Sequence, residues 1–255
     1  MPSFTNAEGY NIHYRELGTG DPVVLVHGWM VGGDVWDPLT DALVAAGHQL
    51  LIPDQRGTGS SAQPYEGYEL ERYASDLVAL VEAAGLRRFK LVGHSMGGQI
   101  AQLVAAQLGE RIESMILICP VPASGVPLPD ELLPLFRGAG GNPEAQTKIL
   151  GMACTQLDDE GLRSLLASAE TVSSMCMAQA FDAWRRGGFA DRLAEISCPT
   201  TVIGTDDPFF SPEFLQEMVV APIANASFVY LAGPGHYPGV ESPAATAAKL
   251  VELLA

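Results

Sequence analysis

Short apolar, β-branched runs alternate with longer segments of helical periodicity along most of this 255-residue chain. This alternation is typical of βαβ units, in which parallel strands form one sheet and helices cover its faces. The strand-like runs lie at residues 23–26, 49–53, 89–93, 115–119, 200–204 and 228–231, and the helical segments at 39–46, 70–84, 96–108 and 243–254. Residues 4–17 alternate around a turn at Asn6–Gly9, which predicts an antiparallel hairpin at the sheet edge. We therefore predict an α/β fold with a mostly parallel sheet flanked by helices.

The segment from residue 120 to residue 198 breaks this alternation, because it contains no strand-like run. It begins with a proline-rich loop at 120–129. Helical patterns follow at residues 130–136, 143–154 and 158–186. We expect this insertion to form a helical cap, or lid, over one end of the sheet. Residues 1–119 and 199–255 are then expected to form the core domain.

The composition restricts the partners of the chain. With 47% hydrophobic and 17% charged residues, it can bury a sizeable core and is unlike a disordered protein. Its formal net charge of −16 would repel the phosphates of nucleic acids and anionic lipids, so we expect neither nucleic acid nor a membrane as a partner. The same charge favours neutral or apolar small molecules over anionic ones.

The sequence contains no targeting or metal-binding signal. The first residues lack the basic and apolar regions of a signal peptide, and no apolar run approaches the ~18 residues that cross a bilayer. The cysteines, Cys119, Cys154, Cys176 and Cys198, have neither CxxC spacing nor a Cys/His metal pattern. We expect them to be reduced and buried, in a cytoplasmic protein that binds no metal.

A glycine-flanked serine in the segment LVGHSMGGQI, residues 91–100, is the strongest functional signal. Ser95 lies between a predicted strand and a predicted helix, where G-x-S-x-G marks a sharp turn. A side chain at Gly93 or Gly97 would clash with the neighbouring strand and helix. The turn exposes the serine oxygen at the carboxyl edge of the sheet, where open α/β sheets bind ligands. We interpret Ser95 as a nucleophile, not as part of a plain glycine-rich bend.

A serine nucleophile needs a base and an acid that orients it, and in this architecture the acid precedes the histidine, with both after the serine. Of the histidines, His13, His27, His48, His94 and His236, only the last follows Ser95. We predict that His236, in a glycine- and proline-rich loop, is the base. Asp206 and Asp207 directly follow a late strand-like run, whereas the preceding strand is followed by no carboxylate before Asp130. The acid is therefore one of these two aspartates.

Donors for the oxyanion of an attacked carbonyl are expected on two backbone segments. One is the N–H of Met96, the residue after the nucleophile. The other is the N–H of Trp29 in the loop HGWM, where Gly28 permits a tight turn. His27 is interpreted as a structural hydrogen-bonding residue and His94 as a flanking one. The Trp29 side chain has two interpretations, a wall of an acyl pocket or plain packing.

Two further patterns have structural explanations. GTGSSA, residues 57–62, matches a nucleotide-binding fingerprint, but QPYEGY follows where the fingerprint requires a helix. We predict a structured loop held by Asp54 and Arg56, and no cofactor. A set of methionine and aromatic residues in the insertion either packs in its core or lines the site, where it would favour apolar substrates. The members of this set are Met152, Met175, Met177, Phe181 and Trp184.

With these pieces together, the sequence resembles the α/β-hydrolase superfamily over essentially its whole length. The matching motifs are HGW (27–29), DQRGTGSS (54–61), GHSMGG (93–98), GTDDP (204–208) and GPGHYP (233–238), in family order. It is most similar to bacterial serine carboxylesterases and to the cofactor-free perhydrolase or non-haem haloperoxidase branch. A serine at position 95 differs from haloalkane dehalogenases and epoxide hydrolases, which need an aspartate nucleophile.

The resemblance implies an α/β-hydrolase fold with an eight-stranded sheet and a helical cap. It assigns the nucleophile, base, acid and two oxyanion-hole donors to Ser95, His236, Asp207, Trp29 and Met96, respectively. Asp206 would then be a turn residue. The implied activity is cleavage of a carboxylic ester, or of a lactone or thioester, through an acyl-enzyme. Alternatives are perhydrolysis, C–C bond or amide hydrolysis with the same residues, a cofactor-free oxygenase, and a ligand-binding homologue.

Overall fold

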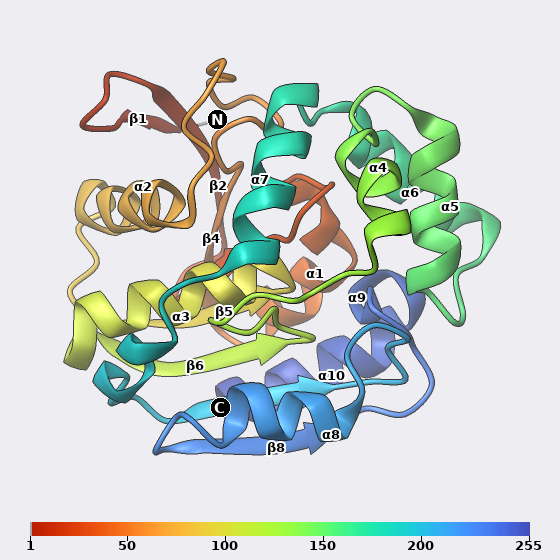
Figure 1. Ribbon diagram of the computed structural model, residues 1–255. Coiled ribbons are helices and arrows are strands. Elements are labelled where there is room, and N and C mark those ends of the chain that lie inside the picture. The colour runs from red at the N-terminus through yellow and green to blue at the C-terminus, as the bar shows by residue number, and fades with distance from the viewer. Residues whose placement is uncertain (1) are drawn as a thin grey trace.

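The computed structural model describes residues 2–255, whose strands form one eight-stranded sheet with helices on both faces (Figure 1). The strands are β1 (Ser3–Thr5), β2 (Asn11–Leu17), β3 (Asp21–Val26), β4 (His48–Pro53), β5 (Phe89–His94), β6 (Ile112–Ile118), β7 (Thr200–Gly204) and β8 (Ala226–Tyr230), in the order β1-β2-β4-β3-β5-β6-β7-β8. β2 is antiparallel to β1 and β4, and every other pair is parallel. The predicted mostly parallel sheet with an antiparallel hairpin at its edge is confirmed.

The helices outside residues 120–198 cover the two faces of the sheet. They are η1 (Gly33–Trp36), α1 (Asp37–Ala45), α2 (Leu70–Ala83), α3 (Met96–Leu108), η2 (Gly109–Arg111), α8 (Pro212–Leu215), the π-helical η5 (Gln216–Val220), α9 (Pro238–Glu241) and α10 (Pro243–Leu254). α1 packs against α10, and α2 packs against α3. Figure 1 shows α3 in front of the sheet and α10 behind it. The predicted bounds of α3 and α10 match the structure.

The chain between β6 and β7 is helical, as predicted. Its helices are η3 (Asp130–Leu132), α4 (Leu133–Arg137), α5 (Pro143–Ala153), α6 (Asp159–Glu170), α7 (Ser174–Arg186) and η4 (Ala190–Glu195). The helical pattern at 158–186 is two helices in the structure, because Ser173 ends the continuity by accepting the amide of Cys176 (3.1 Å) and so caps α7. η4 packs against α3, so the C-terminal end of the insertion lies against a helix that covers the sheet.

The loop at 54–61 is held by buried polar contacts. The Arg56 side chain is fully buried and donates to the Asp76 carboxylate and to the carbonyl of Gly67. Asp54 accepts the amides of Gly33 and Ser60, at 3.2 and 3.0 Å. The GTGSSA segment is irregular and does not open a helix, because the next helix, α2, begins only at Leu70. The prediction of a structured loop is confirmed.

The four cysteines are free thiols. Cys119, Cys176 and Cys198 are buried, as predicted, and Cys154 is half-buried. Burial raises the pKa of the Cys176 thiol to about 12, so this side chain packs as a neutral group.

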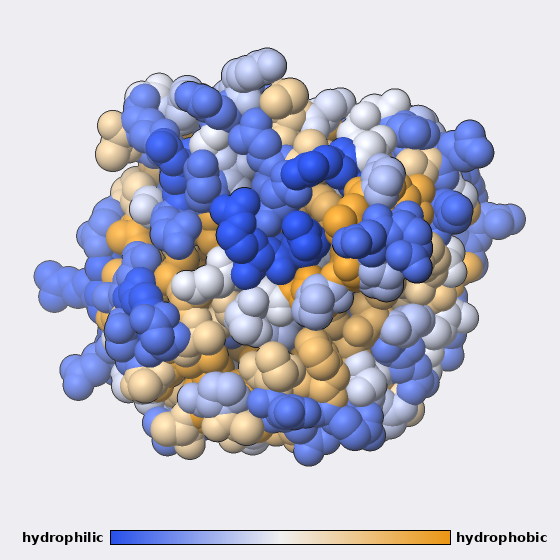
Figure 2. Space-filling model, viewed as in Figure 1, coloured by the Kyte–Doolittle hydropathy of each residue, from blue (hydrophilic) through white to orange (hydrophobic). Residues whose placement is uncertain are grey.

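The surface of residues 2–255 is mixed in polarity. On the face drawn in Figure 2, hydrophilic side chains are interspersed with apolar ones. The large hydrophobic side chains that are exposed in this part of the chain are those of Tyr65 and Tyr230. Within the same residues, no helix combines the length and the apolar character needed to cross a membrane.

Candidate active site

Ser95 occupies a strained turn between β5 and α3. Its φ and ψ are 55° and −121°, a conformation that costs a residue with a side chain roughly 1–3 kcal/mol. A Cβ on Gly93 would lie 2.5 Å from the carbonyl oxygen of Gly97, and one on Gly97 would lie 2.3 Å from that of Val26. Both glycines are therefore required by close backbone packing, as the sequence predicted.

Ser95, His236 and Asp207 form a continuous row of hydrogen bonds. The Nε2 of His236 lies 2.9 Å from the Oγ of Ser95, and its Nδ1 lies 2.6 Å from the Oδ2 of Asp207. A carboxylate only accepts hydrogen bonds, so the Nδ1 carries the proton and the Nε2 is free to accept one from the serine. The three residues follow β5, β8 and β7, whose carboxyl ends meet at one edge of the parallel sheet.

The structure places Asp207, not Asp206, against His236. The Asp207 side chain is fully buried, and its Oδ1 accepts the amide of Phe209 at 2.8 Å. The Asp206 carboxylate is exposed and accepts the amide of Gly233 at 2.8 Å.

Trp29 and Met96 belong to two backbone segments close to the serine. Met96 is the first residue of α3, and Trp29 belongs to the loop after β3. That loop approaches the serine closely, since a Cβ on Gly28 would lie 3.0 Å from the Cβ of Ser95. Within residues 2–255 neither amide donates to a protein acceptor, so both are available to a ligand.

The histidines that precede the site have structural contacts. The Nε2 of His27 accepts the amide of Gln55 at 3.1 Å, so its Nδ1 donates to the Gly28 carbonyl at 2.9 Å. Burial lowers the pKa of His27, which keeps the ring neutral. The Nε2 of His94 donates to the carbonyl of His236 at 2.7 Å, and burial lowers the pKa of His94 to about 3. The predicted structural role of His27 is confirmed.

A cavity of about 230 Å³ lies over Ser95 and His236. Its other lining residues are Trp29, Val121, Val126, Pro127, Leu128, Pro129, Leu132, Phe136, Ile149, Ala153, Trp184, Pro208, Phe209, Phe210 and Tyr237. No aspartate, glutamate, lysine or arginine is among these lining residues. The cavity is therefore suited to an uncharged ligand.

The aromatic residues of the insertion divide between the two predicted roles. Of the predicted set, Trp184 lines the cavity, whereas Met177 and Phe181 are buried in the packing of α7. Trp29 combines both of its interpretations, because it lines the cavity and stacks on Phe136 with ring centroids 5.7 Å apart.

Several lining residues were not predicted from the sequence. Phe209 and Phe210 follow the predicted acid by two and three positions, and this proximity was an available signal. Pro127, Leu128 and Pro129 line the cavity from an irregular loop, for which periodicity gives no signal.

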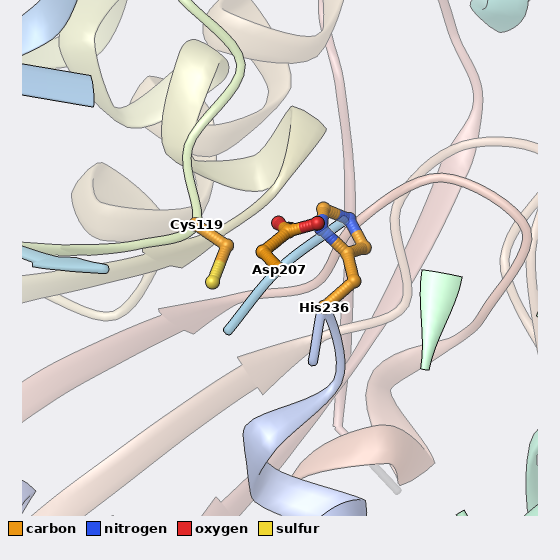
Figure 3. Close-up of side chains that lie close together, drawn as sticks. All are labelled: Cys119, Asp207 and His236. Atoms are coloured by element: carbon orange, nitrogen blue, oxygen red, sulfur yellow. Dashed lines mark hydrogen bonds and ion pairs between the residues drawn. The ribbon is translucent and has the colours of Figure 1, made fainter. Parts of the chain in front are cut away.

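A buried thiol lies on the far side of the Asp207 carboxylate. Figure 3 shows this carboxylate directed at the His236 ring, with the Cys119 side chain opposite. The possible ligand atoms of the three residues lie within 4.8 Å of one another, as in a metal site. However, burial raises the pKa of the Cys119 thiol well above its usual range, and metals bind the thiolate. The Asp207 oxygens already accept hydrogen bonds, so the donor set does not favour a metal.

The fold and these contacts define a class of α/β enzymes with a serine at a strand-to-helix turn and a histidine–aspartate pair beside it. Residues 23–249 match the model of the alpha/beta hydrolase family. The chain belongs to this family. The predicted family, fold and hydrolase class of enzyme are thereby confirmed.

Relatives and solved structures match over most of the chain. A non-heme haloperoxidase of Rhodococcus erythropolis is 29% identical over 254 residues, which cover 92% of this chain and 93% of the relative. A non-heme chloroperoxidase of Streptomyces lividans is 32% identical over 236 residues, with coverages of 81% and 82%. The structure of an esterase from Exiguobacterium antarcticum superposes with a TM-score of 0.92 at 23% identity and covers 98% of both chains.

Proposed function

We propose that this chain is a serine hydrolase that cleaves carboxylic esters, including lactones or thioesters, through an acyl-enzyme. The observation that carries this proposal is the row Ser95–His236–Asp207, with distances of 2.9 and 2.6 Å, of which Ser95 and His236 line the apolar cavity. A serine with this support attacks carbonyl carbon without a cofactor.

In the proposed mechanism, His236 takes the proton of Ser95 as the serine oxygen attacks the carbonyl. The negative charge on the carbonyl oxygen is stabilised by the amides of Trp29 and Met96, which have no acceptor in the described chain. Collapse of this intermediate breaks the ester bond, and His236 gives its proton to the leaving alcohol. Water then repeats the sequence on the acyl-enzyme and releases the acid. Asp207 holds the imidazole in the required tautomer throughout.

We assign residues 120–198 the role of a cap, carried by a core of residues 1–119 and 199–255. The support is that the insertion supplies a large share of the cavity lining, including Phe136, Ile149 and Trp184. A cavity of roughly 150 Å³ is enough to hold benzene, so about 230 Å³ admits a short aliphatic or a single-ring group. The proposed substrates are esters whose acyl group is small and uncharged.

The test combines ester hydrolysis with covalent labelling. The wild-type chain should hydrolyse p-nitrophenyl acetate and butyrate, and a fluorophosphonate should label Ser95. Ser95→Ala should abolish labelling and lower turnover by roughly 10⁴–10⁶-fold, with an unchanged circular dichroism spectrum. Near-normal hydrolysis by Ser95→Ala would contradict the mechanism. Oxygen uptake without ester turnover would instead favour an oxygenase, and folded protein that is neither labelled nor active would favour a ligand-binding homologue.

Perhydrolysis is the second candidate, and the similarity to haloperoxidases favours it. In this reaction, hydrogen peroxide in place of water attacks the acyl-Ser95 carbonyl, and a peracid leaves as the serine is regenerated. Peracid formation from an ester and peroxide, compared with hydrolysis of the same ester, measures the partition. A peracid yield equal to that of Ser95→Ala would exclude this activity.

A further inference from the structure

The carboxylate of Glu241 accepts backbone amides from two distant segments of the chain. Its Oε2 accepts the amides of Thr155, Gln156 and Gly235, at 2.8, 2.9 and 2.9 Å. Its Oε1 accepts the amide of Tyr237 at 3.0 Å. Charge-assisted bonds of this kind are stronger than neutral ones and fix the groups that they join.

One of these segments carries His236. Gly235 and Tyr237 are its immediate neighbours, so Glu241 holds the backbone on both sides of the imidazole. Glu241 itself ends α9 and is half-buried. Within residues 2–255, Glu241 forms no ion pair. The partners of its carboxylate are therefore these backbone amides, whose hydrogen bonds it accepts.

The other segment is the end of α5, whose residues Ile149 and Ala153 line the cavity. Thr155 and Gln156 follow the C-cap of this helix, Cys154. The amide of His236 donates to the carbonyl of Ala153 at 2.9 Å.

Close packing reinforces these hydrogen bonds. The hydroxyl of Thr155 donates to the carbonyl of Gly233 at 2.8 Å. A Cβ on Gly235 would lie 2.6 Å from the Ala153 carbonyl oxygen. The wall of the cavity and the loop of the histidine are therefore one packed unit, with Glu241 at its centre.

We propose that Glu241 is a positioning residue that holds His236 in line with Ser95 and joins it to the α5 wall of the cavity. The assignment rests on the proposed function, in which His236 is the base. A glutamine at 241 would turn an N–H₂ group toward amide donors and could not satisfy both sides. The His236 imidazole would then no longer be held at hydrogen-bonding distance from the Oγ of Ser95.

Glu241→Gln and Glu241→Ala test this role. We expect kcat for p-nitrophenyl acetate, per fluorophosphonate-titrated site and well below the unfolding temperature, to fall about 10- to 100-fold with little change in KM, since small displacements of a catalytic group cost this much. The matched control is Asp158→Ala, which removes the cap of α6, an acceptor for the Gly161 amide at 2.8 Å. Within residues 2–255, Asp158 forms no hydrogen bond with the histidine loop. It should lower stability and leave kcat within about twofold.

A second readout needs no substrate. The downfield proton resonance of the His236 Nδ1–H, identified by its absence in His236→Ala, should shift or broaden in Glu241→Gln and remain in place in Asp158→Ala. Wild-type kcat and an unchanged resonance in Glu241→Gln, or an equal loss in Asp158→Ala, would overturn the assignment. If the wild-type chain neither hydrolyses the ester nor reacts with the fluorophosphonate, the proposed function fails, and the resonance alone decides the role of Glu241.

Discussion

Asp206 and Asp207 are neighbours in the chain, yet their carboxylates serve different parts of the structure. Asp207 is buried and bonds His236, whereas Asp206 is exposed and bonds Tyr230 and Gly233. The hydrogen bond from the Tyr230 hydroxyl, and then the one from the Gly233 amide, lowers the pKa of Asp206. Asp206 is thus suited to holding the connection after β8.

The two aspartates should respond differently to the same substitution. Asp207→Asn removes the acceptor that fixes the tautomer of His236, and we expect kcat for p-nitrophenyl acetate to fall about 10⁴-fold. Asp206→Asn keeps the side-chain shape outside the site, and kcat should change by no more than about threefold. Steady-state kinetics on both purified variants decides between them. A larger loss in Asp206→Asn would transfer the role of acid to that residue.

A matched pair of glycines tests the packing of the turn at Ser95. Gly97→Ala places a Cβ 2.3 Å from the Val26 carbonyl oxygen, so we expect it to destabilise the protein by about 2–3 kcal/mol or to prevent folding. Gly151→Ala, on α5, meets no atom within 4 Å and should stabilise the protein by about 0.5–1 kcal/mol. Urea denaturation measures both. Equal stability of the two variants would contradict the role of close packing at Gly97.

The cavity wall should set the preferred acyl length. Ile149→Ala enlarges the cavity and leaves room for about two more CH₂ groups of the acyl chain. At about 0.8 kcal/mol per buried CH₂, the ratio of kcat/KM for p-nitrophenyl hexanoate to that for acetate should therefore rise by roughly tenfold. Leu165→Ala is the control, because Leu165 is buried in α6 and does not line the cavity. It should cost about 2–5 kcal/mol of stability without changing the ratio. An unchanged ratio in Ile149→Ala would place the acyl group elsewhere.

His94 should make stability depend on pH in the acidic range. Its pKa in the folded protein is lowered from 6.5 to about 3, chiefly by burial, so the unfolded chain binds the extra proton between these values. The contribution is present above pH 6.5 and is lost as the pH falls toward 3, at about 1.4 kcal/mol per pH unit. In His94→Gln, urea denaturation at several pH values in this window should show a smaller slope by that amount. The same slope in both proteins would mean that folding does not lower the pKa of His94.

Much of the fold was predictable because its signals are local. The runs that became β3 to β7 are largely apolar, and their predicted bounds lie within three residues of the observed ones. The last run was predicted at 228–231, whereas β8 spans Ala226–Tyr230 and its side chains are partly exposed. The break between α6 and α7 was missed because apolar residues continue at helical spacing through it. The cap residue Ser173 was the available signal.

The site was predictable where one residue type had few candidates. His236 is the one histidine after Ser95, and the acid lay within one pair of neighbours. The cavity lining and Glu241 were not predictable in this way, because they depend on contacts between segments far apart in the chain. The amides of Thr155 and Gly235, both bonded to Glu241, are separated by the whole of α6, α7, β7 and β8.

The bond between the His236 amide and the Ala153 carbonyl has an evolutionary consequence. Substitutions that reshape the end of α5 to admit a new substrate would also displace the backbone of His236, the proposed base. The part of the lining at Pro127–Pro129 forms no hydrogen bond with the His236 loop within residues 2–255 and can diverge at lower cost to the chemistry. Variation among descendants of this chain should therefore concentrate on that part of the lining, and the α5 end should change only together with the histidine loop.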